Sequence, residues 1–456
     1  MSGFSRTPQA HYTLGMKPST LGCLFAITLT ASLSAADWPQ WRGPRGTGAT
    51  DEKNLPVTWN ATENVAWRAP LGGVGVSSPI VSGDRVFVTS QIGTGVRRAG
   101  NHPRLAQGSG AVGERALAAG QGGPAGDRTF FVVEAFSRSD GKRLWQHRLE
   151  ATGPLPGVHD KHNLASPSPV TDGQIVYAWF GTGQIVALDM NGKVVWQRHL
   201  GQEIAPFEIN WGHASSPALF GDTVLLLCDH APASYLLAVD KKTGKERWRV
   251  DRGKGRMSYT TPFVVESPTG PELIVNSSQR VDAYDPRTGA FLWHVGGANQ
   301  FPIPAPTFHD GVIYMTRGYR SGPYMAIRPG GRGDISSSHI VWEVPTGAPY
   351  ISSLVYHEGI LYMASDVGAV TAIDAATGRR IWQQRVDGIF SASPVAADGK
   401  VYFVSETGET VVLKAGRQAE VLARNDVGER LIASPAISNG QIFLRSDDRL
   451  FAIGKR

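Results

Sequence analysis

Cysteine is nearly absent from this chain of 456 residues, which contains only Cys23 and Cys228. Removal of residues 1–36 after export would leave one cysteine, so a disulfide within the mature chain is excluded. Cys228 follows the apolar residues Val224–Leu227. We therefore expect a buried, unreactive thiol at this position.

Long apolar runs are also scarce. One run, from Leu21 to Leu33, lies near the start of the chain and is followed by the small residues Ser34–Ala36, as at a signal-peptide cleavage site. The alternative is a membrane anchor that is retained, but the run is shorter than the roughly 20 residues that a membrane span requires. We expect residues 1–36 to be a signal peptide, with translation starting at Met1 or Met16, and the protein to reach the periplasm or cell envelope.

Charge and catalytic motifs are equally sparse. Without residues 1–36 the chain has 43 basic and 39 acidic residues, scattered along its length. This small excess gives no basis for nucleic-acid binding. The chain lacks Gly-x-Ser-x-Gly, His-Glu-x-x-His and Cys-x-x-Cys-His motifs. No catalytic residue and no metal site is therefore predicted from motifs.

What the chain has is a repeat. Its fullest copies, at 238–248, 283–293 and 372–382, read Ala-x-Asp-x-x-Thr-Gly followed by Trp four residues after the Gly. A period of 40 to 50 residues with turn chemistry at fixed offsets is typical of a β-propeller. The Asp accepts backbone N–H bonds in its own turn, and the Gly supplies the positive φ that closes the turn.

Counting the repeat predicts eight four-stranded antiparallel blades. The blade-start residues are Pro79, Pro169, Pro217, Pro262, Pro306, Leu354, Pro394 and Pro435. The outer-strand positions are Trp67, Trp145, Trp196, Trp248, Trp293, Trp342, Trp382 and Leu422. The last start is followed by only three strands, whereas 64–71 is an outer strand with no blade before it. We predict an all-β, eight-bladed propeller over 64–456, closed when the N-terminal strand completes the last blade, with the Trp residues packed between blades.

At these copies the chain resembles the pyrroloquinoline-quinone-like (PQQ-like) propeller repeats of quinoprotein dehydrogenases and of BamB, the outer-membrane assembly lipoprotein. The resemblance covers nearly all of residues 37–456 and implies the fold. It leaves the function open, because the same repeat carries enzymes and non-catalytic scaffolds. The opening segment Asp37–Pro44, with Trp38 and Trp41, resembles exported bacterial propellers, and we expect residues 37–63 to pack on the ring.

The resemblance implies different requirements for the two functions. Quinoprotein dehydrogenases use adjacent disulfide-bonded cysteines, a calcium ion held by acidic and amide side chains, and an Asp base. This chain has no adjacent cysteines, and Cys23 precedes the apolar run, where it makes a poor lipid-attachment site. We expect a BamB-like, non-catalytic scaffold or binding module without a cofactor, a monomeric ring with an envelope protein or peptide as partner. The alternative is a PQQ-dependent dehydrogenase with a reduced site, holding PQQ and calcium.

Two connections between blades are longer than the rest. Trp145 to Pro169 takes 24 residues and Trp196 to Pro217 takes 21, whereas the later connections take 12 to 14. Such connections lie on one face of a propeller, and functional residues concentrate on loops of this kind. Our candidates for ligand or partner binding are His159, His162, Asn163, Trp211, His213 and Tyr259.

Three interpretations of these candidates stay open. The histidines could bind a metal, but no acid or cysteine completes a standard ligand signature. The loops could contact a ligand or peptide, or their polar groups could only hydrogen-bond to the rim.

A Gly/Ala-rich insertion at 91–127 has no apolar periodicity, so we expect it to be flexible. The alternative for this insertion is a lid or a partner-binding segment that orders on contact.

Overall fold

The computed structural model describes residues 1, 3, 37–93, 95–97, 128–319 and 322–455. The predicted signal peptide and most of the predicted insertion lie outside these residues, so both stay predictions. Ala35–Arg456 form one compact unit, to which all the described strands belong. None of the described helices is long and apolar enough to cross a membrane.

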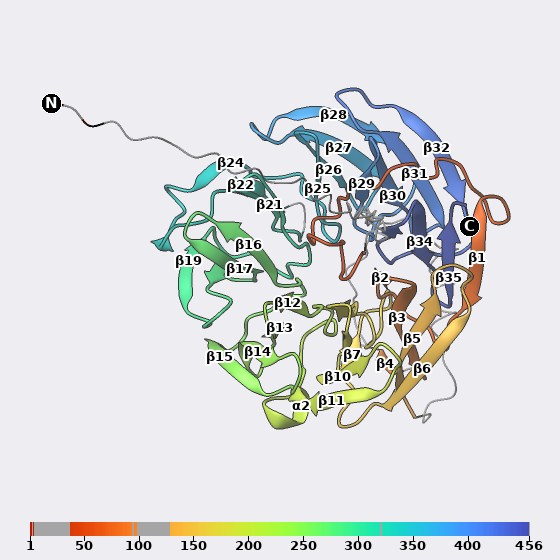
Figure 1. The fold of residues 1–456 in the computed structure, drawn as a ribbon, viewed down its shortest axis with the longest axis horizontal. Coiled ribbons are helices and arrows are strands. Elements are labelled where there is room, and N and C mark those ends of the chain that lie inside the picture. Colours follow the sequence, from red (N-terminus) through yellow and green to blue (C-terminus); the bar gives the residue numbers. More distant parts are fainter. Residues whose placement is uncertain (2, 4–36, 94, 98–127, 320–321, 456) are drawn as a thin grey trace. The chain divides into compact units, whose positions relative to one another are not determined.

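Eight antiparallel sheets surround a common axis and confirm the predicted eight-bladed propeller (Figure 1). Blade 1 contains β2 (Ile80–Ser82), β3 (Arg85–Ile92), β5 (Phe130–Ser137) and β6 (Arg143–Glu150). Blade 2 contains β8 (Val170–Thr171), β9 (Ile175–Trp179), β10 (Gln184–Asp189) and β11 (Val194–His199). Blade 3 contains β12 (Ala218–Phe220), β13 (Thr223–Asp229), β14 (Ser234–Asp240) and β15 (Glu246–Gly253). Blade 4 contains β16 (Phe263–Ser267), β17 (Gly270–Asn276), β18 (Val281–Tyr284) and β19 (Phe291–Val295).

The second half of the ring follows the same order. Blade 5 contains β20 (Thr307–His309), β21 (Val312–Thr316), β22 (Tyr324–Ile327) and β24 (Ile340–Val344). Blade 6 contains β25 (Val355–His357), β26 (Ile360–Ala364), β27 (Ala369–Asp374) and β28 (Arg380–Arg385). Blade 7 contains β29 (Val395–Ala397), β30 (Lys400–Val404), β31 (Glu409–Lys414) and β32 (Val421–Asp426). Blade 8 contains β33 (Ala436–Ser438), β34 (Gln441–Arg445), β35 (Arg449–Ile453) and β1 (Val65–Pro70).

Three short elements decorate the ring. Strands β4 (Val96–Arg97) and β7 (Gly157–Val158) pair in parallel, so the start of the insertion in blade 1 lies beside the long connection to blade 2. A single helical turn, α2 (Leu200–Glu203), lies in the long connection to blade 3. Strand β23 (Gly333–Asp334), in the connection between β22 and β24 of blade 5, pairs in parallel with β19 as a fifth strand of blade 4.

The N-terminal strand closes the ring as predicted. Strand β1 pairs antiparallel with β35, so the first described strand of the chain and the last one share a sheet. Trp67 on β1 is 5% exposed, and its indole N–H donates to the carbonyl of Arg138 in blade 1 at 2.8 Å. Blade 8 therefore joins blade 1 through the same contact that joins most other neighbours.

The repeat joins each blade to the next through Trp. In six blades the indole N–H donates to a carbonyl in the turn before the outer strand of the following blade; the six donors are Trp67, Trp145, Trp196, Trp248, Trp342 and Trp382. Trp293 instead donates to the Glu272 carboxylate in its own blade at 2.7 Å. Leu422, the eighth member, is 36% exposed. Buried aromatic rings with a satisfied N–H thus supply much of the contact between blades.

The turn glycine is required by the same contact. Gly244 in blade 3 has φ +68°, and a Cβ added to it would lie 2.7 Å from the ring of Trp196 in blade 2. Gly244→Ala should therefore lower the free energy of unfolding by about 2–4 kcal/mol, from left-handed backbone strain and from the clash. Gly311→Ala is the matched control, because Gly311 has φ +74° and open space around its Cβ position. It should cost only the backbone strain, about 1–2 kcal/mol in urea unfolding. Equal losses in the two variants would contradict this account of the interface.

The segment before β1 runs along the inside of the ring and then across it. Trp38 is fully buried and pairs with Val81 on the inner strand of blade 1. Ala49 pairs with Ala396 on the inner strand of blade 7. Further on, the backbone N–H of Trp59 donates to the Asn425 side chain on the outer strand of that blade at 2.8 Å. The segment before β1 therefore bridges the inner strands of blades 1 and 7.

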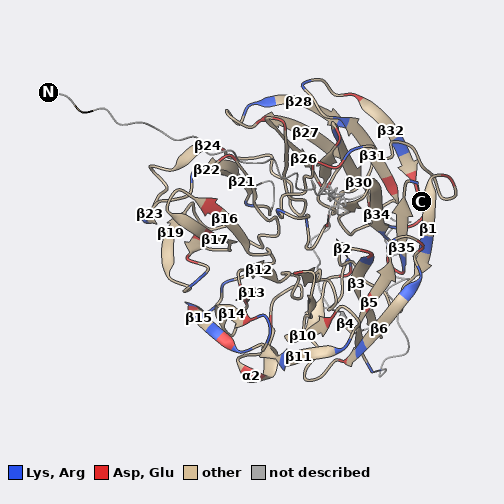
Figure 2. Cartoon of the chain, viewed as in Figure 1, with Lys and Arg blue, Asp and Glu red and all other residues tan. Residues whose placement is uncertain are grey.

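Charged side chains are mostly excluded from the ring's interior. Lys and Arg gather on outer strands such as β6, β15, β28 and β32, whereas the inner strands are largely uncharged (Figure 2). The hydrophobic clusters lie between adjacent sheets and bury residues of both. Polar side chains that line the axis are therefore the candidates for a functional role.

Candidate functional site

The blade starts form a ring of hydroxyl groups around the axis. The residue before each blade-start position is Ser, Thr or Ala, and the eight residues are Ser78, Ser168, Ser216, Thr261, Ala305, Ser353, Ser393 and Ser434. The backbone N–H of Ser78 donates to the Ser168 hydroxyl at 2.8 Å, and that of Ser434 donates back to Ser78 at 3.0 Å. Five further links of this kind connect neighbouring blades. We call these residues the hydroxyl ring; the link from Thr261 is missing because Ala305 has no hydroxyl group.

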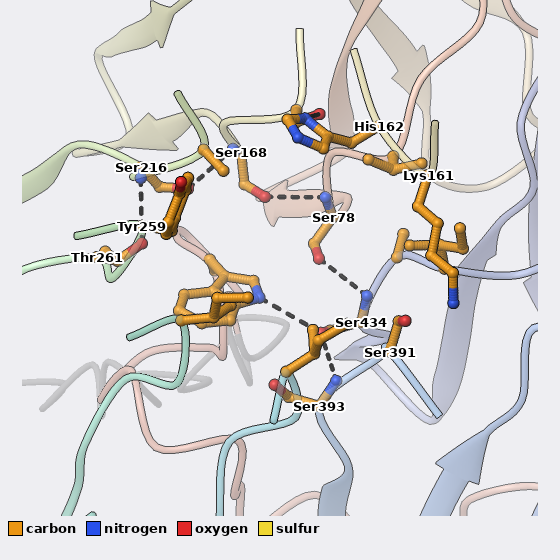
Figure 3. A pocket seen from close by; sticks show the side chains of 18 of the residues that line it. Ser78, Lys161, His162, Ser168, Ser216, Tyr259, Thr261, Ser391, Ser393 and Ser434 are labelled. Atoms are coloured by element: carbon orange, nitrogen blue, oxygen red, sulfur yellow. Dashed lines mark hydrogen bonds between the residues drawn. The ribbon is translucent and has the colours of Figure 1, made fainter. Parts of the chain in front are cut away.

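A second set of residues faces the same space. Alternate residues of an extended chain point to the same side, so the residues two positions before the ring also point to the axis. All eight line one axial cavity of about 200 Å³: Val76, Ser166, Ala214, Tyr259, Ile303, Ile351, Ser391 and Ile432. We call them the wall residues. Six members of the hydroxyl ring line the cavity as well, so a largely apolar wall adjoins a hydroxyl-lined floor (Figure 3).

The N-terminal segment completes the floor. Trp41 lines the cavity, and its indole N–H donates to the Ser434 hydroxyl at 3.3 Å. The Arg42 guanidinium lies 5.8 Å from the centre of the Trp41 ring and donates to the carbonyls of Thr47 and Pro306 at 2.9 and 2.7 Å. Arg42 is 1% exposed, and burial lowers its pKa to about 9, so the group stays charged at neutral pH.

Four of the six predicted site residues line this cavity: His159, His162, Trp211 and Tyr259. The two long connections are joined to each other here. His162 Nε2 lies 2.6 Å from the carbonyl oxygen of Trp211, and the backbone N–H of His159 donates to the same oxygen at 3.0 Å. The His159 ring meets the Trp211 ring edge-on at 5.7 Å. The imidazoles therefore hold the Trp211 loop beside the cavity.

The other two predicted residues lie outside the lining. Asn163 is 6% exposed; its amide donates to the Val74 carbonyl at 2.9 Å and accepts from the Ala165 N–H at 3.0 Å. His213 is 1% exposed and lies 3.0 Å from the ring of His230, nitrogen to nitrogen. Both side chains fasten the loops that carry the lining residues. Across the described residues, no group of three His, Cys, Asp or Glu is placed to hold a metal ion.

Sequence reasoning missed the one charged side chain of the described lining. Lys161 belongs to the connection between blades 1 and 2, yet its ammonium group lies 2.7 Å from the carboxylate of Glu406 in blade 7. The Glu406 side chain is 3% exposed and also accepts the Ser391 hydroxyl. This ion pair neutralises the charge of Lys161. No local pattern signals it, because the partners are 245 residues apart.

Comparison with known proteins identifies relatives of most of the propeller. A family model described as outer membrane protein assembly factor BamB matches residues 129–318 and 334–419. The chain is 25% identical to tetrathionate hydrolase of Acidithiobacillus ferrooxidans over 363 residues, which cover 75% of this chain and 65% of that protein. It is 24% identical to BamB of Yersinia pestis over 339 residues, which cover 72% of this chain and 76% of BamB.

Solved structures match at lower identity. BamB from Moraxella catarrhalis superposes with a TM-score of 0.52 and 16% identity, covering 72% of this chain and 94% of that one. Quinohemoprotein alcohol dehydrogenase from Comamonas testosteroni superposes with a TM-score of 0.63 and 13% identity, covering 92% of this chain and 81% of that one. At these identities the superpositions show a shared fold and nothing about activity.

Proposed function

Because the chain belongs to the family of the outer membrane protein assembly factor BamB, we propose that it is an exported, non-catalytic binding module of the cell envelope. Its ring is a monomer, and its partner is an envelope protein or peptide that inserts a side chain into the axial cavity. The location in the periplasm is part of this proposal, as is the absence of nucleic-acid binding.

The observation that carries the proposal is the size and lining of the cavity. Sites for small molecules and cofactors usually enclose about 300–1,000 Å³. The axial cavity measures about 200 Å³, which suits one inserted side chain. Trp41, Trp211, Tyr259 and Tyr350 give it aromatic surface, and such residues anchor protein partners because they bury large areas at low entropic cost.

A quinone-dependent dehydrogenase is the alternative that the PQQ-like repeat brings with it. The described lining does not fit that requirement, since its one charged side chain, Lys161, is already paired with Glu406. Such an enzyme would need acidic and amide side chains for the calcium and an Asp as base, and no Asp, Glu, Asn or Gln is among the described lining residues. We derive no reaction step through a quinone, and the cavity supports binding better than redox chemistry.

Photocrosslinking in the native envelope tests the proposal. A benzophenone amino acid in place of Trp211 should form a discrete adduct with one envelope protein, because this side chain lines the cavity. The same amino acid in place of Val195 is the control, since Val195 is 43% exposed on the outer strand of blade 2. The adduct at position 211 should be at least 10-fold more abundant. Equal adducts at both positions, or none at position 211, would overturn the proposal, as would recovery of the protein from the cytoplasm.

A further inference from the structure

The hydroxyl ring has hydrogen-bonding capacity that the described residues leave unused. A serine or threonine hydroxyl has one proton to donate and two lone pairs to accept. The six ring members that line the cavity are Ser78, Ser168, Ser216, Thr261, Ser393 and Ser434. Each accepts a backbone N–H from a neighbouring blade, and none of the six donates its own proton to a described acceptor. Six O–H donors therefore surround the floor of the cavity.

Two buried arginines donate to backbone carbonyls beside this floor, and neither forms an ion pair with a described carboxylate. Arg42 and Arg445 are each 1% exposed. Arg42 lies under the Trp41 ring and is bonded only to carbonyl oxygens. Arg445 donates to the Ser77 carbonyl at 3.1 Å and to the Thr89 carbonyl at 2.6 Å, directly beside the ring residue Ser78. Among the described residues, no carboxylate forms an ion pair with either guanidinium.

The two guanidinium charges favour a positive potential at the floor, although Glu134 and Asp447 offset part of the charge of Arg445. Burial lowers the pKa of Arg445 to about 10, so both groups stay protonated at neutral pH. A cavity with low-dielectric walls concentrates the field of nearby charges. Lys161 adds nothing to this potential, because Glu406 neutralises it. The floor thus presents O–H donors in a positive field, whereas the wall presents Ile303, Ile351 and aromatic rings.

We propose that the axial cavity binds an apolar organic carboxylate, with the carboxylate on the hydroxyl ring and the apolar group against the wall residues. This inference rests on the proposed binding function and specifies its ligand. Hydrogen bonds to an ionised acceptor are about twice as strong as neutral ones. A carboxylate can accept from about four such donors, so the ring should discriminate between a carboxylate and its amide. The carboxylate has two sources, a free organic acid or the C-terminal residue of a polypeptide, and the two share one chemistry.

Isothermal titration of the mature protein distinguishes these sources. The probes are the peptide acetyl-Gly-Ser-Gly-Trp as free acid, the same peptide as C-terminal amide, and 3-phenylpropionate. We expect the free-acid peptide to bind at least 10-fold more tightly than the amide. If 3-phenylpropionate binds as tightly as the peptide acid, the ligand is a free organic acid, and if only the peptide binds, it is a polypeptide C-terminus.

A matched pair of variants locates the binding site. Ser168→Ala and Ser446→Ala each remove one buried hydroxyl that accepts a backbone N–H, but only Ser168 belongs to the hydroxyl ring and lines the cavity. Ser168→Ala should weaken binding of the free acid about 10-fold, and Ser446→Ala should leave it unchanged. Equal affinity for acid and amide, equal effects of the two variants, or no binding by any probe would each overturn the proposal. Crosslinking at position 211 does not depend on a carboxylate, so the binding module could survive this failure.

Discussion

A chain that begins at Gly72 should fail to form a stable monomeric ring. The deletion removes β1 and leaves β35 with an unpaired edge. It also removes Trp38, Trp59 and Trp67, which are all at most 5% exposed. Loss of one buried aromatic side chain typically costs 3–5 kcal/mol, and a whole domain is usually stable by only about 5–15 kcal/mol. Size-exclusion chromatography should therefore show aggregates, and circular dichroism should show no cooperative melting near the wild-type temperature.

Two controls separate ring closure from a general effect of truncation. A synthetic peptide of residues 37–71 should restore the cooperative transition, because it can add β1 to the open edge. In the full-length chain, Trp67→Ala should cost about 3–5 kcal/mol. Leu422→Ala changes the equivalent position in blade 7, which is 36% exposed, and should cost under about 1 kcal/mol. A truncated monomer that melts like the full chain would show that closure contributes little.

The fold could be predicted because the sequence repeats one blade pattern eight times. The copies in blades 2, 3, 4 and 6 carry the turn Asp, the glycine and the Trp, and each of these residues has a local physical role. A copy that departs from the pattern can still be aligned with the others. Leu422 stands where other copies have Trp, but its spacing still identifies blade 7. Ring closure could be predicted by counting strands. Residues 64–71 form an outer strand with no blade before it, and Pro435 is followed by only three strands.

The cavity was predictable in part. Loop length pointed to His159, His162 and Trp211, since long connections stand out against a fixed period. The wall residues could also have been predicted from the sequence, because they lie two positions before the Ser, Thr or Ala of every blade start. Two contacts could not be predicted: the approach of Trp41 to the axis and the pairing of Lys161 with Glu406. Both depend on how distant segments meet after the ring has closed.

The buried pair of His213 and His230 shows the same limit and has a measurable consequence. His213 Nε2 lies 3.1 Å from the Ser215 carbonyl, which can only accept, so the proton sits on Nε2. His213 Nδ1 therefore accepts a hydrogen bond from the Nε2–H of His230 at 3.0 Å. The rings pack against Trp179 and Phe207, with 4.2 Å between the centres of His213 and Trp179. Both imidazoles are neutral in this arrangement, and nothing in the local sequence pairs them.

Acidification should destabilise the protein through this pair. Burial lowers the pKa of His230 from 6.5 to about 3, and burial, helped by the charge of His230 and His162, holds the pKa of His213 well below 6.5. The unfolded chain takes up a proton on each imidazole below pH 6.5, whereas the folded chain does not. Stability is therefore fully present above pH 6.5 and declines as the pH falls toward the folded pKa. Each histidine contributes a loss of about 1.4 kcal/mol per pH unit in this window.

Urea unfolding of the wild type and of His230→Gln between pH 7.5 and 4.5 measures this contribution. Glutamine keeps an N–H that can donate to His213 but does not titrate, so the decline of stability with pH should be shallower by about 1.4 kcal/mol per unit. His309→Gln is the control for the substitution itself, because the His309 side chain is 42% exposed. Parallel slopes for His230→Gln and the wild type would contradict the prediction.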